Sequence, residues 1–99
     1  MTEDEQKRRA DNSRLLLEDP TLKEAFAALR ERFTHHIIGS ELSQADKREH
    51  AFRMMKALEE VWFQLQSWVN EGKLIDDRRK LRKQTPDFRS GLNGNDAQA

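Results

Sequence analysis

The stretch EEVWFQLQSWVNEGKL, residues 59–74, gathers two tryptophans, one phenylalanine, two valines and two leucines in a chain that is only 35% hydrophobic and 36% charged. We expect it to belong to a long helix over about 44–71 with a wide apolar stripe, ended by Gly72. Met55, Trp62 and Val69 flank the seam of that stripe. The seam itself follows the three-and-four spacing of coiled-coil a and d positions, at Ala51, Met54, Leu58, Val61, Leu65 and Trp68.

A second amphipathic helix precedes this one, over about 20–38. Asp19 can cap its start, Pro20 suits its first position, and Gly39 is expected to end it in a left-handed conformation. Its apolar side chains step by four, three, four and four along one face, at Leu22, Phe26, Leu29, Phe33 and Ile37.

Two long helices joined by a short loop predict an all-α fold for a single small domain of 99 residues. We expect an antiparallel hairpin of two long helices with short flanking helices, which assembles into a helical bundle. In the loop, Ser43 and Asp46 resemble a capping box that starts the longer helix.

The flanking segments complete the expected domain plan. Residues 1–75 form the helical domain, in which a short N-terminal helix packs Leu15 to Leu17 on the hairpin. Residues 76–89 are expected to form a basic short helix or linker that stops at Pro86. The final residues, 90–99, are rich in glycine, asparagine and aspartate and are expected to be disordered.

The apolar stripe is wider than the shorter helix can cover. Phe52 and Phe63 also lie on the side of the helix away from the seam, and exposing several large apolar side chains to water is unfavourable. We therefore expect self-association into a homo-oligomer or docking on another protein; the alternative is that the N-terminal leucines cover the stripe within one chain. The candidate interface residues are Leu58, Val61, Trp62, Leu65, Trp68, Phe52 and Phe63.

The segment from Lys73 to Arg89 carries seven cations against three acids. Such density suits contacts with phosphates or with an acidic protein surface, although a solvated helix end would look the same. Because the chain has 18 cations and 18 acids, the zero net charge favours a protein partner, and nucleic acid stays open. The candidate contact residues are Arg78, Arg79, Lys80, Arg82 and Lys83.

No residue pattern indicates catalysis. The chain has no cysteine, and the adjacent His35 and His36 would diverge by about 100° on a helix and could not share a metal ion. No serine stands in a nucleophile elbow, and no neighbouring carboxylates lie in an apolar setting. We expect no catalytic residue, no metal site, no cofactor and no enzyme. Neither a signal peptide nor an apolar run of about 18 residues is present, so we expect no membrane contact.

The segments LLEDPTLKEAFAALRERF and ADKREHAFRMMKALEEVWFQLQSWVNEGKL resemble small helical-hairpin proteins of unknown function encoded by tailed bacteriophages and prophages. The resemblance covers about residues 15–75. Where that family usually has a tryptophan-rich loop, this chain has THHIIGSELSQ. The matching positions are Leu16, Pro20, Phe26, Leu29, Phe33, Asp46, Arg48, Glu49, Phe52, Leu58, Val61, Leu65, Gly72, Lys73 and Leu74.

The resemblance implies a viral origin, expression in the cytoplasm of a bacterial host, and an assembly or accessory role that includes association with the virion. The expected function is that of a non-enzymatic protein that oligomerises through the hairpin and acts in virion assembly or as an adaptor, with its basic tail contacting a partner. Two alternatives stay open: a small DNA- or RNA-binding regulator, and a phage-made inhibitor that binds a host protein.

Overall fold

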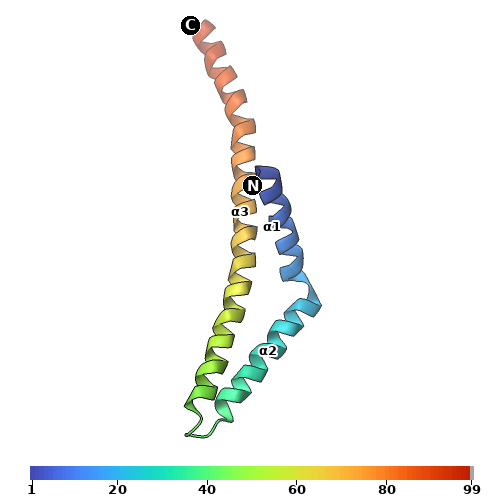
Figure 1. Cartoon of the computed structure of the whole chain (residues 1–99). Helices are drawn as coiled ribbons and strands as arrows, with labels where there is room; N and C mark the ends of the chain where they lie inside the picture. Colours follow the sequence, from blue (N-terminus) through green and yellow to red (C-terminus); the bar gives the residue numbers. More distant parts are fainter. Residues whose placement is uncertain (99) are drawn as a thin grey trace.

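The computed structural model is all-helical, with three α-helices and no strand in the part of the chain that is described (Figure 1). Helix α1 is Glu3–Glu18, α2 is Pro20–Ile38, and α3 is Ala45–Gln98. The structure describes the backbone of residues 1–98 and the side chains of residues 1–83. The expectation of an all-α fold is confirmed.

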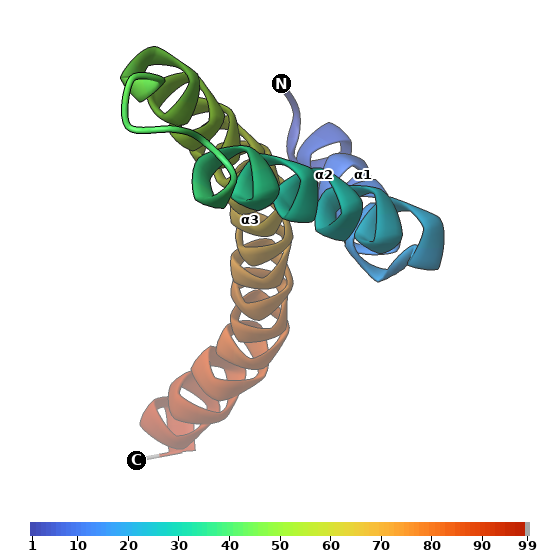
Figure 2. The same cartoon turned by 90° about the horizontal axis from the view of Figure 1, so that it is seen from below.

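The molecule is a rod. Helices α1 and α2 run one after the other along α3 and in the opposite direction to it, with a bend at their junction (Figure 1). Seen along the rod, α2 crosses α3 obliquely (Figure 2). The extents are 83 × 24 × 21 Å and the radius of gyration is 23.4 Å, whereas a compact chain of this length would measure about 13 Å. A shape this extended has little interior.

Local capping explains where the first two helices begin. The Thr2 side chain accepts a hydrogen bond from the Glu5 N–H at 3.1 Å. Asp19 accepts one from the Leu22 N–H at 2.8 Å, and Pro20 is the first residue of α2, so the predicted start of α2 is confirmed.

The loop between α2 and α3 differs from expectation. Gly39 has a φ of −82°, so the predicted left-handed ending is wrong; the last turn closes with an ordinary backbone. The predicted capping box is also wrong, because α3 begins at Ala45 and the loop groups bond elsewhere. The Gln44 side chain accepts from the Glu41 N–H at 2.9 Å, and the Arg48 guanidinium donates to the Glu41 carbonyl at 2.7 Å.

Gly72 does not end the long helix, as the sequence had suggested, but lies in the interior of α3. A Cβ atom at this position would overlap the Cβ of Ala10 on α1. Glycine is therefore required here for close approach of two helices, not for termination. The helix continues through the predicted boundary near residue 75. The backbone of α3 also continues past Pro86 to Gln98, so the predicted stop at Pro86 is wrong, whereas the predicted disorder of 90–99 stays a prediction.

The side of α3 that faces α1 and α2 is offset from the predicted seam. Met54 and Val61 are 39% and 52% exposed, so their placement in the seam is wrong. Apolar residues fill both members of the pairs 54–55 and 61–62, and the spacing alone therefore fits two registers. None of the residues in the observed seam is exposed: Ala51, Met55, Leu58, Trp62, Leu65, Val69, Gly72, Asp76 and Arg79.

Among residues 1–83, only a few side chains, in or near this seam and on the α1 side that faces α3, are fully buried. The α2 stripe has the predicted spacing, but each of its five members is only half-buried. Most of the residues that are buried are small or lie where α1 meets α3. The buried residues are Ala10, Ser13, Leu17, Ala51, Val69, Gly72 and Ile75.

Candidate interaction surfaces

Helix α1 lies against α3 through small residues. Ala10 and Ser13 are buried there, and the Ser13 hydroxyl donates to the Arg9 carbonyl at 2.7 Å, which satisfies the only buried polar side chain of the described residues. Ile75, only 1% exposed, is the largest enclosed side chain among residues 1–83. Leu17 joins this contact, whereas Leu15 and Leu16 are exposed, so one of the three predicted leucines packs as expected.

Ion pairs border the contact between α1 and α3. Lys7 bonds to Asp76 at 2.9 Å, and this hydrogen bond is the main reason that the pKa of Lys7 is raised. Arg9 reaches Glu71 at 3.3 Å. Each of these side chains is partly exposed, so the pairs orient α1 more than they stabilise it.

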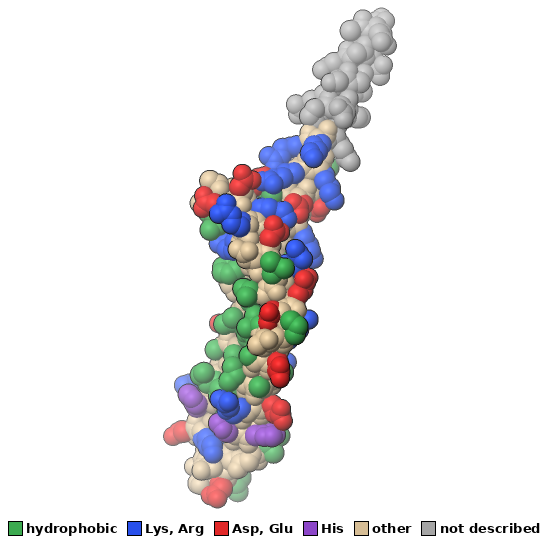
Figure 3. Space-filling model, turned by 90° about the vertical axis from the view of Figure 1, so that its right-hand side faces the viewer, with side chains coloured by type: hydrophobic (Ala, Val, Ile, Leu, Met, Phe, Trp, Pro, Cys, Tyr) green, Lys and Arg blue, Asp and Glu red, His purple; other side chains and the backbone are tan. Residues whose placement is uncertain are grey.

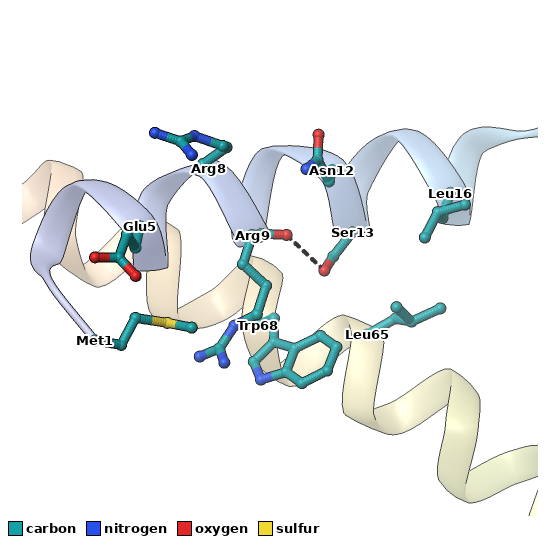
Figure 4. A pocket seen from close by; sticks show the side chains of 9 residues that line it. All are labelled: Met1, Glu5, Arg8, Arg9, Asn12, Ser13, Leu16, Leu65 and Trp68. Carbon is teal, nitrogen blue, oxygen red and sulfur yellow. Dashed lines mark hydrogen bonds between the residues drawn. The ribbon is translucent and has the colours of Figure 1, made fainter.

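Trp68 lies beneath a cation. The Arg9 guanidinium carbon is 4.6 Å from the centre of the Trp68 ring, and the two side chains meet between α1 and α3 (Figure 4). Leu16 and Leu65 line the same open depression of about 360 Å³. The Nε of Arg9 is buried and has no hydrogen-bond partner among the described residues. Trp68, a predicted interface residue, is therefore half covered by its own chain.

Trp62 is held by α2. Its ring meets the ring of Phe26 edge to face, with centroids 5.3 Å apart and an interplanar angle of 74°. A notch of about 290 Å³ opens beside the pair and is bordered by the cations Lys23 and Arg30. Like Trp68, Trp62 is half-buried, and a single copy of the chain does not fully enclose either indole.

Two strips of large apolar side chains remain uncovered, one on each side of the α3 seam. Phe52 and Phe63, which are 54% and 64% exposed, lie on one side. Met54 and Val61 lie on the opposite side, because helical residues nine positions apart are separated by about 180°. In the space-filling view, hydrophobic side chains gather over the middle of the rod, below a region rich in lysine and arginine (Figure 3). Leu58 and Leu65, in the seam, are half-buried.

The five predicted cationic contact residues do not form one uniform cluster. Arg79 bonds to Glu3 at 2.8 Å and to Asp4 at 2.7 Å, and Arg82 bonds to Glu3 at 3.0 Å. The Arg79 hydrogen bond is the main reason that the pKa of Glu3 is lowered, and Glu3 in turn raises the pKa of Arg79. Two of the five cations are thus paired with the start of α1.

The other three cations face solvent. The Nε of Arg78 donates to the carbonyl of Leu74 at 3.4 Å, while Lys80 and Lys83 form no ion pair with a side chain that the structure describes. Sequence reasoning missed the acidic N-terminus as a partner of this segment. The opposite charges of the two segments were the only available signal.

Comparisons with protein-family models, with curated proteins and with solved structures found no match to this chain. Among residues 1–83, no three histidine, cysteine, aspartate or glutamate side chains gather closely enough to hold a metal ion. In the same range, no helix is both long and apolar enough to cross a bilayer.

Proposed function

We propose that this chain is a non-enzymatic protein that works by self-association, with α3 as the associating element. The observation that carries the proposal is the exposure of Phe52, Val61 and Phe63, each more than half accessible, on either side of a seam that is already packed. Their spacing leaves them on faces that α1 and α2 do not reach. A soluble monomer seldom leaves such strips uncovered without a partner.

Energetic considerations support association. Burying a side chain of this size contributes on the order of 1.5–3 kcal/mol. If one interface buries Phe52 and Phe63 of two copies, these four side chains offset much of the estimated cost of association, about 4–15 kcal/mol. The elongated shape, with few buried side chains, leaves the single chain with little stability of its own, so assembly into a helical bundle would stabilise it.

The biological role that we propose is virion assembly or adaptor work for a phage, in the cytoplasm of its bacterial host. The support is the resemblance of residues 15–75 to phage-encoded helical-hairpin proteins. The exposed cations Arg78, Lys80 and Lys83 would then contact an acidic surface of a viral or host protein.

Solution mass tests the central claim. Sedimentation equilibrium over a wide dilution series should give a mass that is a multiple of 11.7 kDa and that falls on dilution. A folded monomer at every concentration, with full helical circular dichroism, would refute self-association.

The exposed cations also favour a second function, nucleic-acid binding. In that case, affinity for duplex DNA should fall with salt, with a slope of about −0.9 for each phosphate contacted. Exchanging Lys80 and Lys83 for glutamine should reduce the slope by nearly two units, whereas exchanging the distant Lys47 should leave it unchanged. Absence of binding at low salt would exclude this function.

A further inference from the structure

The exposed strip that contains Phe52 and Phe63 also carries two opposite charges. Phe52, Lys56, Glu59 and Phe63 follow one another in steps of four, three and four residues, so they occupy an arc of about 60° on α3. We call these four residues the Phe52 face. Its centre lies about 100° around the helix from the seam, so α1 and α2 leave it uncovered.

Three of the four side chains of the Phe52 face already interact within the chain. The Lys56 ammonium lies 5.5 Å from the centre of the Phe52 ring and 3.6 Å from the Glu59 carboxylate. Both charged side chains keep substantial exposure, at 59% and 37%. They can therefore meet a partner without leaving an interior position.

The order of residues in the Phe52 face is self-complementary. The strip is symmetric about the point between residues 57 and 58, with the two phenylalanines at equal distances from that point and Lys56 and Glu59 at equal distances inside them. The residue numbers of each such pair therefore sum to 115. If a second copy lies antiparallel across that point, each Phe52 meets Phe63 of the second copy and each Lys56 meets Glu59 of the second copy. Both charged contacts are then attractive, and both ends are closed by aromatic pairs.

The parallel arrangement is opposed by the same residues. It would place Lys56 against its own copy and Glu59 against its own copy, so both charged contacts would be repulsive. The opposite strip, with Met54 and Val61, has no comparable pair of charges between its apolar residues and does not select an orientation.

We infer that two copies of this chain associate antiparallel through the Phe52 face, with the two-fold axis between residues 57 and 58. The inference rests on the proposed self-association and specifies its surface, orientation and register. It commits to a second copy as the occupant because the charge order matches itself.

Charge exchange tests the pairing. The variants K56E and E59K should each weaken dimerisation about tenfold or more, since two attractive pairs per dimer become repulsive. The double variant K56E/E59K reverses the strip without changing its symmetry, so its dimerisation should return to within about threefold of the unaltered chain. K47E makes the same charge change on another side of α3 and should have little effect.

Cross-linking tests the register independently, and the absence of native cysteine makes the test clean. Residues 49 and 66 also sum to 115, so E49C mixed with Q66C should join as a heterodimer with a short bis-maleimide. Neither variant alone should join to itself, because its two copies would be about 25 Å apart along the axis.

The outcomes separate the two proposals. If the unaltered chain is monomeric, both the proposed self-association and this register are wrong. If the unaltered chain dimerises, but the charge reversals do not change its affinity and E49C and Q66C form no mixed cross-link, another face forms the interface. In that case self-association stands and the role of the Phe52 face is refuted.

Discussion

Replacing Gly72 with alanine should loosen α1 from α3, although the same change stabilises most helices. In an ordinary helix interior, alanine is favoured over glycine by about 1 kcal/mol. Here the new Cβ would overlap the Cβ of Ala10 and lie 3.8 Å from its Cα, so the two helices must separate. Overpacking of this kind costs about 1–3 kcal/mol. We expect a net loss of up to about 2 kcal/mol in the docking of α1.

Amide hydrogen exchange resolves this loss, because it reports the docking of α1 separately from global unfolding. Protection should fall in α1 and around Ile75, which would gain exposure, and should stay unchanged in α2. The double variant A10G/G72A removes the obstructing methyl group and should recover part of the loss, which gives a coupling energy of about 1 kcal/mol or more. An increase in α1 protection for G72A alone would refute the reasoning.

The remaining predictions concern charge. Because Arg79 holds the pKa of Glu3 below its ordinary value of 4.5, the stabilisation from Glu3 is fully present above that value and is lost as the pH falls through the lowered pKa. The exchange protection of α1 should therefore fall in that pH range, and the variant E3Q should remove this pH dependence. The variant W62F leaves Trp68 as the only indole of the chain. In this background, R9A should shift the tryptophan emission to longer wavelength and destabilise the chain by about 0.5–2 kcal/mol. An unchanged emission wavelength would show that Arg9 does not shield the Trp68 ring from water.

The start of α2 could be predicted because its signals are local. Asp19 and Pro20 act within one turn, and the apolar spacing of α2 fits a single face. The seam of α3 could not be predicted, because adjacent apolar residues allowed two registers and the choice depends on Phe26, which lies 36 residues before Trp62. A periodic pattern indicates that a helix has an apolar side, but the partner decides which part of that side is buried.

The misreading of Gly72 and of the basic segment has a related cause. Glycine near an apparent break usually marks a helix end, and only the distant Ala10 shows that it marks a close approach instead. Arg79 likewise resembled a free contact residue until Glu3, 76 residues away in sequence, was placed beside it. The exposure of Phe52 and Phe63 was foreseeable, because both lie away from either possible seam.

The two contacts with α3 differ in composition. Helix α1 packs through buried side chains, such as Ala10 and Leu17, and is oriented by partly exposed ion pairs, such as Lys7 with Asp76, whereas α2 has only half-buried apolar contacts, such as Phe26 with Trp62. Added salt screens the ion pairs, and cooling weakens the apolar contacts. High ionic strength should therefore change the angle at which α1 lies on α3 more than it changes the stability of the contact, and on cooling α2 should detach from α3 before α1 does.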